Sequence, residues 1–381
     1  MKFKKVLIPA LFSLCLFSLT SCDILEFIKD NTDIDTDGIA DLINGDPTEE
    51  TYEPVDIDET NLDYGYLDLQ KYSNKEQLIG LYTEIDGILG EFMTSSKNLT
   101  ATPREISGET KNYYIIKDEV SFSKYGLSYE QASSVYKCVL LDNPEYYFPS
   151  NTLLNASITI GNTTKKYLAL CCDEDYILGS VRANYNQQLT TYDSTIKGLI
   201  ASTTNPIQKT KIIHDYIINN GQYAFKPDGV TPDDSSMAHN LLGLVVNHKG
   251  VCESYAELFH YLLKNNGICS IMVTGDAYTS MPAIGEGEAH AWNYVKFNFD
   301  VEGEVVPKWF GFDVTWDDPA NLTVCNHTYF GQNSVKESPH TYYPFTSSHV
   351  PDSNGNMNRG LNYLYALPTL SDTSINLEEL D

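Results

Sequence analysis

The sequence predicts an α+β fold built from two successive regions. Apolar residues at helical spacing dominate 73–202, which also contains one stretch of alternating, strand-like residues. A strong helical pattern then begins at Cys252, and three strand-like runs follow it. We therefore expect a smaller α+β region over 69–204, a core over 205–345 in which a helix packs on an antiparallel sheet, and a C-terminal extension over 346–381.

The elements of the first region follow from local signals. A capping box at Ser73–Glu76 (SNKE) predicts the start of a helix. A second helix fits Tyr129–Leu141, because an Asn-Pro pair stops it. The alternation over Asn155–Cys172 around a central Gly-Asn pair predicts a β-hairpin. A third helix fits Leu178–Ser202.

Local start and stop signals also predict the helices and strands of the core. Asn205-Pro206 opens a helix, and a short helix fits Met237–Val246. The helix from Cys252 closes at Asn266-Gly267, which is a helix stop signal. The expected strands that follow are Cys269–Thr274, His290–Phe299 and Glu304–Thr315.

Three residues of this core form a candidate catalytic set. Cys252 lies in KGVCESYA (249–256), His290 in EAHAWN (288–293) and Asp313 in WFGFDVTWDDP (309–319). A thiol needs a base to lose its proton, and the base needs a group that holds its tautomer. The dipole of the helix that starts at Cys252 would favour thiolate. Each residue alone also fits a structural role, but the three motifs together favour a triad.

These motifs resemble those of the transglutaminase-like superfamily, bacterial branch. The resemblance covers about Asn205–Phe330 and includes HDY (214–216), Tyr223 and TYF (328–330); DNPEY (142–146) is similar to a segment that precedes such cores. It implies a papain-like/transglutaminase-like core with Cys252 as nucleophile, His290 as base and Asp313 as the residue that orients the base. The implied reaction is acyl transfer on peptide amide bonds through a thioester, with no required cofactor and no metal in the catalytic core.

Several features of the site stay open. The backbone N–H of Cys252 is expected to donate to the oxyanion, with Gln222 or Tyr223 as candidate side-chain donors. Glu253-Ser254 departs from the family pattern, and we expect no effect on the nucleophile. Asp317 lies close enough to Asp313 to influence the electrostatics of the site, whereas the other histidines considered are interpreted as structural or surface groups: His214, His239, His248, His260, His327 and His340.

Two classes of function remain. The first is a thiol enzyme acting on protein or peptidoglycan peptides, for which we expect water as the acceptor, because an exported enzyme meets solvent more often than a competing amine. The second is a non-catalytic lipoprotein that uses the same fold to contact protein or glycan.

The chain begins with a predicted export signal over residues 1–21. Three lysines precede an apolar run that ends in Leu-Thr-Ser-Cys22. This ending resembles a lipobox, which implies that Cys22 carries a lipid such as palmitate and anchors the protein to the bacterial cell membrane or outer surface. The alternative is an ordinary signal with a chance cysteine. No later stretch is apolar for about 18 residues, so we expect no spanning helix.

An acidic, flexible tether is expected over residues 22–68. Its Asp33, Asp35, Asp37 and Asp41 resemble one calcium-binding repeat, although plain acidic linker is the alternative. Loss of the signal moves the formal charge from −27 to −30, and such a charge excludes nucleic acid as a partner. No CxxC pair occurs, and the adjacent Cys171-Cys172 are expected to be buried rather than bridged.

Overall fold

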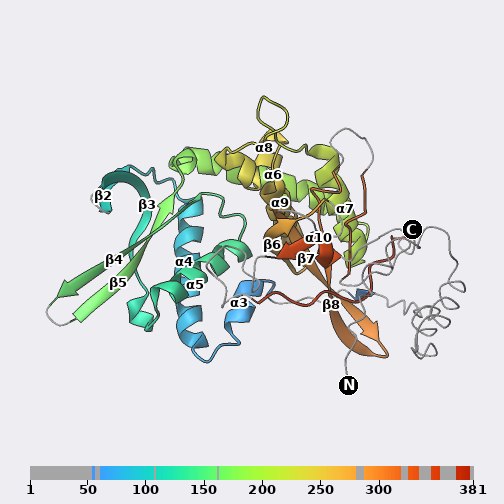
Figure 1. Cartoon of the computed structure of the whole chain (residues 1–381), viewed down its shortest axis with the longest axis horizontal. Helices are drawn as coiled ribbons and strands as arrows, with labels where there is room; N and C mark the ends of the chain where they lie inside the picture. Colours follow the sequence, from blue (N-terminus) through green and yellow to red (C-terminus); the bar gives the residue numbers. More distant parts are fainter. Residues whose placement is uncertain are drawn as a thin grey trace, which may run out of the picture. The chain divides into compact units, whose positions relative to one another are not determined.

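Two antiparallel β-sheets, each packed against helices, form the described part of the chain (Figure 1). The computed structural model describes residues 54–55, 61–106, 109–160, 163–279, 287–318, 325–333, 345–351 and 366–377. Residues Glu53–Asp381 belong to one unit. The predicted α+β class is confirmed, whereas the boundary between residues 204 and 205 stays a prediction.

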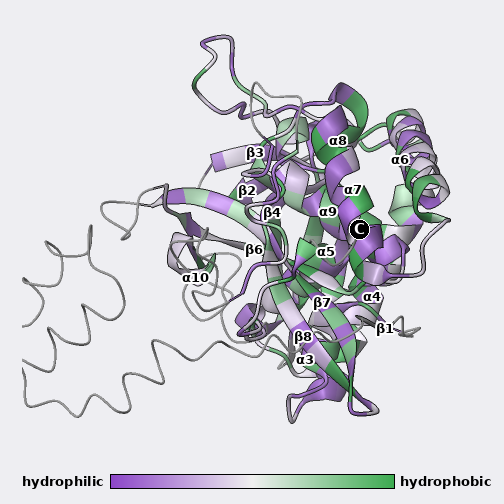
Figure 2. Ribbon diagram, turned by 90° about the vertical axis from the view of Figure 1, so that its right-hand side faces the viewer, coloured by the Kyte–Doolittle hydropathy of each residue, from purple (hydrophilic) through white to green (hydrophobic). Residues whose placement is uncertain are grey.

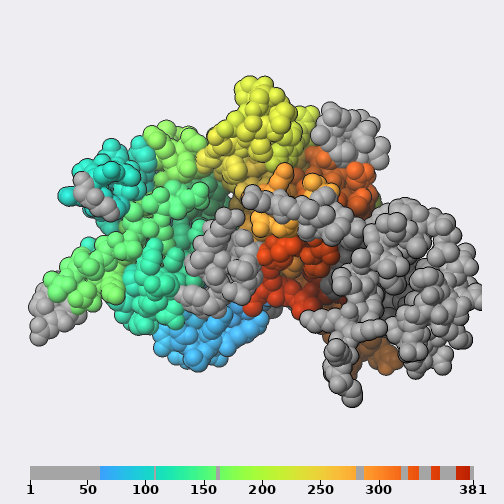
Figure 3. Space-filling model, in the orientation of Figure 1, coloured from blue at the N-terminus to red at the C-terminus, as the bar shows by residue number. Residues whose placement is uncertain are grey.

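The first sheet has the strand order β2-β3-β5-β4, and its strand β3 packs against the helix α4, which in turn packs on α5. The predicted hairpin is confirmed in its pairing, although β4 begins six residues earlier than expected, and its two strands extend beyond α4 and α5 (Figures 1 and 3). The elements are α4 (Lys75–Thr94), β2 (Ala101–Ile106), β3 (Glu109–Ser121), α5 (Tyr129–Asp142), β4 (Pro149–Ile160) and β5 (Thr163–Cys172), with short 3-10 turns at Ser123–Tyr125 and Glu174–Tyr176.

The helix starts of this region differ in how they are capped. At α5, Ser128 and Gln131 form a reciprocal capping box, which satisfies otherwise unpaired N–H groups. At α4 the N-cap is Asn74, and its side chain makes no capping hydrogen bond. The capping box predicted at Ser73–Glu76 is therefore wrong, and α4 is held instead by burying its apolar face: Leu78, Leu81, Tyr82, Ile85, Leu89 and Phe92.

The helices of the core surround one buried helix. α9 (Cys252–Asn265) lies among α7 (Pro206–Asn220), α8 (Leu242–Asn247) and the second sheet (Figure 2). The single short helix predicted over 237–246 is wrong: a 3-10 turn at Ser236–His239 precedes α8. Asn240 separates the two, because its side chain bonds to both Ser236 O and Leu242 N.

The second sheet carries the strands on which α9 packs. β7 (Glu288–Val301) is central and pairs with β6 (Ser270–Ala277) and β8 (Glu304–Phe312) in antiparallel register. β9 (His349–Pro351), preceded by α10 (Phe345–Ser348), extends the sheet beyond β6. α6 (Gly179–Ile200) packs against α7 and α8.

Folded structure begins before the predicted end of the tether. β1 (Pro54–Val55) pairs with β7, and α3 (Tyr64–Leu69) packs on α5. The backbone N–H groups of Gly65 and Tyr66 donate to the buried Asp142 carboxylate, which fixes the start of α3. Across the described ranges, no helix is both long and apolar enough to cross a membrane.

Candidate active site

Cys252 is the first residue of α9, and a tight backbone crossing fixes its position. Gly250 N donates to Gln222 O at 3.2 Å, and Ala224 N donates to Gly250 O at 2.9 Å. A Cβ at Gly250 would lie 2.3 Å from Ser254 Oγ, so only glycine fits without displacing the first turn of α9. The glycine therefore lets the chain turn directly into the helix that carries the thiol.

His290 and Asp313 are brought together by the pairing of β7 with β8. The register pairs Asn293 with Phe312, so His290 and Asp313 lie near the same end of the two strands. His290 Nε2 lies 2.7 Å from Asp313 Oδ2. This contact leaves Nδ1 as the ring nitrogen available to another group.

The thiol of Cys252 lies beside the strand that carries His290. Cys252 packs against Ala256 and Ala291, the residue that follows His290 on β7. Its Sγ donates a hydrogen bond to Glu253 Oε2 at 3.0 Å. Within the described ranges no hydrogen bond joins Sγ to His290, so the three predicted residues share a site while the thiol bonds elsewhere.

The environment of Cys252 keeps its thiol protonated. Burial raises the pKa of this thiol, and the negative charge and hydrogen bond of Glu253 raise it further, while the Ala291 N–H opposes them. Burial and Glu253 therefore oppose the thiolate that the helix start was expected to favour. The expectation that Glu253 leaves the nucleophile unaffected is wrong, because its carboxylate is the bonding partner of the thiol.

Glu253 is held between the thiol and His239. Its Oε1 lies 3.3 Å from His239 Nδ1. Burial alone raises the pKa of Glu253, but the hydrogen bonds from His239 and Cys252 lower it to about 2. The hydrogen bond that His239 donates to Glu253 in turn raises the pKa of His239, which outweighs the opposing effect of partial burial.

Asp313 has a second histidine partner, which the sequence reasoning missed. His349 Nε2 lies 2.9 Å from Asp313 Oδ2, and its Nδ1 lies 2.8 Å from Ser348 Oγ. Burial raises the pKa of Asp313, yet the two histidines lower it well below its usual range. His349 follows no recognisable motif and lies 36 residues beyond Asp313. The only sequence signal for this contact is that residue 349 is a histidine.

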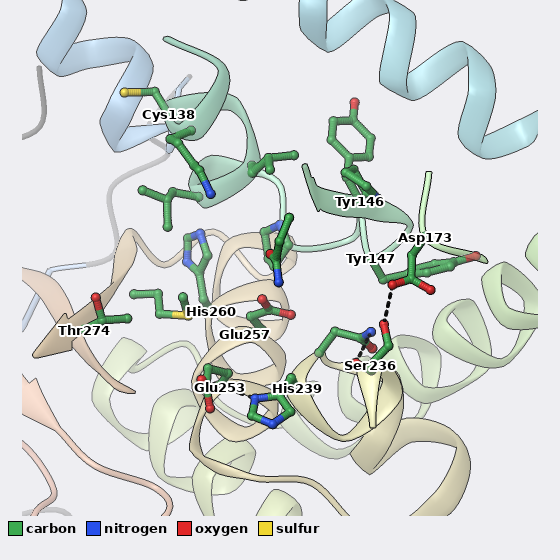
Figure 4. Close-up of a pocket in the computed structure, with 18 of the residues that line it drawn as sticks. Cys138, Tyr146, Tyr147, Asp173, Ser236, His239, Glu253, Glu257, His260 and Thr274 are labelled. Atoms are coloured by element: carbon green, nitrogen blue, oxygen red, sulfur yellow. Dashed lines mark hydrogen bonds and ion pairs between the residues drawn. The ribbon is translucent and has the colours of Figure 1, made fainter. Parts of the chain in front are cut away.

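A cleft of about 870 Å³ opens beside His290. Figure 4 shows Glu253, Glu257 and His260 on α9 along one side of it, with Tyr146 and Tyr147 from the first region on the other. Burial raises the pKa of Glu257 to about 8, and the Leu241 N–H that it accepts opposes this shift. The cleft thus offers hydrogen-bonding groups of both regions to a ligand that reaches His290.

The two candidate oxyanion side chains differ in position. The Tyr223 ring packs on a cluster that includes Val251, and the pKa of its phenol is raised by burial and then by the Cys252 and Glu253 groups. Gln222 has an exposed side chain, and its main-chain oxygen bonds to Gly250. Tyr223 is therefore within electrostatic range of the thiol, and an oxyanion role for either residue stays a prediction.

The remaining predicted sites lie outside the described residues. These are Cys22 and the aspartates Asp33, Asp35, Asp37 and Asp41. Cys171 and Cys172 are buried and free, as expected.

Parts of the chain are similar to several solved structures. A crystal structure of a TGase is 13% identical with a TM-score of 0.29, and the match covers 44% of this chain but only 45% of that chain, less than half its length. A protein from Cytophaga hutchinsonii, described as a candidate cysteine protease, is 19% identical (TM-score 0.25; 46% of this chain, 68% of the other). The periplasmic domain of TgpA from Pseudomonas aeruginosa is 13% identical (TM-score 0.23; 44% and 66%). A comparison with curated proteins gave no match.

The family comparison is more direct. Residues 193–314 match the model of the transglutaminase-like superfamily. The matched segment contains Cys252, His290 and Asp313, and it spans α7, α9 and strands β6 to β8. Residues 193–314 of this chain therefore form a transglutaminase-like domain.

Proposed function

We propose that the protein is a cysteine-dependent acyl-transfer enzyme that hydrolyses peptide amide bonds. The observation that carries the proposal is the His290–Asp313 pair, 2.7 Å apart, placed beside a cysteine that starts a helix and next to an open cleft. Membership of the matched segment in the transglutaminase-like superfamily supports the same reaction class.

In this mechanism His290 takes the proton of the Cys252 thiol through Nδ1, because Nε2 is bound to Asp313. The thiolate attacks the carbonyl carbon of the substrate, and a C–S bond forms. His290 then gives the proton to the amine as the C–N bond breaks, which leaves a thioester. Water, activated by the same histidine, attacks the thioester, and the acid product leaves as the thiol is restored.

The charge that develops on the carbonyl oxygen needs N–H donors. The backbone N–H of Cys252 is at the start of α9, where N–H groups lack partners within the helix. Tyr223 is the better placed of the two candidate side-chain donors, because its ring packs beside the segment that leads into Cys252.

We further propose that the enzyme is exported, anchored through Cys22 and presented to protein or peptidoglycan peptides at the cell surface. The Leu-Thr-Ser-Cys22 ending supports this location. Metabolic labelling with a fatty-acid analogue, compared between wild type and Cys22→Ser, tests the anchor. A wild-type protein without label contradicts it.

A screen of products by mass tests the reaction. Glutamine-containing peptides and cell-wall peptides are incubated with the protein and an excess of a primary amine. We expect acid products that disappear in Cys252→Ala. Amine adducts that dominate and also disappear in Cys252→Ala would instead identify a transglutaminase.

A second candidate is a non-catalytic lipoprotein that contacts protein or glycan partners through this fold. The burial of Cys252, which is only 7% exposed, and the bond of its thiol to Glu253 favour this alternative. Limiting iodoacetamide distinguishes the two. Preferential labelling of Cys252 supports the enzyme, whereas an inert Cys252 with labelling of another cysteine supports the scaffold.

A further inference from the structure

A second cluster of ligand-type side chains lies apart from the predicted triad. His214 and Asp215 project from α7, and His327 comes from the segment that follows the Asp313 turn. Asp215 Oδ1 lies 2.9 Å from His214 Nδ1 and 2.7 Å from His327 Nε2. One nitrogen of each ring and one carboxylate oxygen thus lie within 4.8 Å of one another.

The other nitrogen of His214 is also committed. Its Nε2 lies 3.2 Å from Asp317 Oδ2, and the backbone N–H of Tyr329 holds this carboxylate at 3.0 Å. His214 and Asp317 are both fully buried. Histidines that bind metals usually donate their second ring N–H to a carboxylate in this way, which fixes the tautomer.

A neutral His214 ring cannot donate a hydrogen bond to both Asp317 and Asp215. If His214 donates Nε2–H to Asp317, its Nδ1 lone pair faces Asp215 Oδ1 across 2.9 Å. Two acceptors at that separation repel each other unless a cation lies between them. Either a proton or a metal ion satisfies this requirement, and His327 supplies a further nitrogen on the same oxygen.

We propose that His214 Nδ1, Asp215 Oδ1 and His327 Nε2 bind a divalent transition-metal ion of the zinc type. Two imidazole nitrogens and one carboxylate oxygen suit zinc, whereas calcium and magnesium prefer sites made of oxygen ligands. The site departs from the expectation that the core holds no metal.

The surroundings orient the carboxylate and leave a route for the ion. Lys211 Nζ binds the other oxygen, Oδ2, at 2.8 Å, so Oδ1 is the oxygen that faces the two rings. The side chains of Asp215 and His327 are each 24% exposed, which gives an ion access from solvent. The charge of Lys211 opposes a cation, so we expect weaker binding than at a site closed by four cysteines.

Metal at this site would brace the turn that carries Asp313. Asp317 N donates to Asp313 O at 3.1 Å, and Asp313 N donates to Tyr329 O at 3.1 Å. Asp317 also contacts His214, so one ion would join α7, the segment around His327 and this turn. The expected role is structural, because none of the three ligands contacts Cys252 or His290 in the described contacts.

Zinc binding by the folded protein tests the proposal. The full chain in a Cys252→Ala background is dialysed against Zn²⁺, and bound zinc is measured by elemental mass spectrometry. We expect one zinc ion per chain, and at least tenfold weaker binding in His327→Ala. His248→Asn, which replaces an exposed histidine at positive φ with a residue that tolerates it, is the matched control and should bind like its parent.

Two results would overturn the site. One is the absence of zinc from the parent, and the other is equal zinc in a folded His327→Ala, checked by circular dichroism. Zinc that is lost in His349→Ala but kept in His327→Ala would place the ion on the other His–Asp–His cluster and also overturn the proposal.

Discussion

Glu253 controls the reactivity of the predicted nucleophile. It bonds to the Cys252 thiol at 3.0 Å and to His239 on its other oxygen. A negative charge next to a thiol disfavours the thiolate, so catalysis requires Glu253 to turn away or His290 to take the proton despite it. The carboxylate also lines the cleft, where a bound substrate would meet it.

Glu253→Gln should make Cys252 more reactive. The raised pKa of this thiol keeps it protonated at neutral pH, first through burial and then through Glu253. Loss of the negative charge lowers that pKa, so the alkylation rate should begin to rise at a lower pH than in wild type. The measurement is the rate of iodoacetamide labelling of Cys252 across pH 6 to 10. At a pH below the thiol pKa, this rate should rise about tenfold for each unit by which the pKa falls.

Glu257→Gln is the matched control for this change. Glu257 lies one turn along α9 in the same cleft, but its described hydrogen bond comes from Leu241 N rather than from the thiol. Its labelling profile should stay close to wild type. Overlapping profiles for Glu253→Gln and wild type would show that burial alone sets the pKa.

His349 should affect the reactivity of Cys252 through its hydrogen bond to Asp313. It donates to the oxygen that also contacts His290, so in His349→Ala the Asp313 carboxylate keeps the Trp316 N–H on its other oxygen but holds the His290 ring less firmly. A hydrogen bond to a charged group contributes about 1.5–3 kcal/mol, so Cys252 labelling should slow by roughly tenfold or more. His349→Gln retains an N–H donor and should recover part of the rate. Unchanged labelling in a folded His349→Ala would contradict this role.

At the scale of elements, the sequence predicted what local signals determine. α5 and α9 begin at their expected residues, Tyr129 and Cys252, because an amphipathic face and a stop signal mark each of them. β2 and β3 were missed, since β2 contains no buried residue and β3 contains only two, so neither strand presents the apolar face that marks a half-buried strand. β1 was missed as well, because it consists of two residues and depends on pairing with a strand more than 200 positions away.

The candidate site was predicted in part for the same reason. Motifs identified Cys252, His290 and Asp313, and the pairing of β7 with β8 brings the last two together. Motifs did not identify His349 or the role of Glu253, because both depend on side-chain orientation and on contacts made only in the folded chain. The interpretation of His214 and His327 as ordinary structural groups overlooked that they share one carboxylate.

Replacing either of two glycines with alanine should change the free energy of unfolding, and the two changes should have opposite signs. Gly250→Ala places a Cβ against Ser254, the third residue of α9, so the first turn must shift. Overpacking of this kind costs about 1–3 kcal/mol and should also slow Cys252 labelling. Gly198→Ala in α6 meets nothing within 4 Å, and it should stabilise by roughly 0.5–1 kcal/mol. Urea unfolding measures both, and equal effects of the two changes would contradict the steric argument.

At the scale of the whole described unit, polar contacts join the first region to the transglutaminase-like domain. Tyr176 Oη accepts from Asn240 Nδ2 at 2.8 Å, and Ser236 Oγ donates to Asp173 Oδ2 at 3.1 Å, as Figure 4 shows for the second pair. Residues of both regions line the cleft beside His290. The first region therefore forms part of the proposed substrate site and is more than a spacer.

Lys264 makes two of the polar contacts between the two regions. Its Nζ donates to Asp142 O at 2.5 Å and to Asn143 Oδ1 at 2.9 Å, and it pairs with Asp63 at 2.6 Å. Burial lowers the pKa of Lys264, but the surrounding carboxylates raise it above its usual 10.5. One ammonium at the end of α9 thus holds the end of α5 and the residue that precedes α3.

Lys264→Met should loosen this joint while keeping the apolar part of the side chain. The substitution removes a largely buried ammonium group and leaves its hydrogen-bond acceptors without a donor, which should lower the free energy of unfolding by about 3 kcal/mol. Because the folded-state pKa is raised, this stabilisation is fully present below the unfolded value near 10.5 and is lost as pH rises through the folded value. The difference between wild type and variant, measured by urea unfolding, should therefore be constant near pH 8 to 9, above the pKa of about 7 of the neighbouring Asp142, and shrink in stronger alkali. Lys197→Met is the control, since Lys197 pairs with Asp193 within α6 and is 53% exposed, so its loss should cost less than about 1 kcal/mol. Similar costs for the two lysines would mean that the contacts of Lys264 do not hold the regions together.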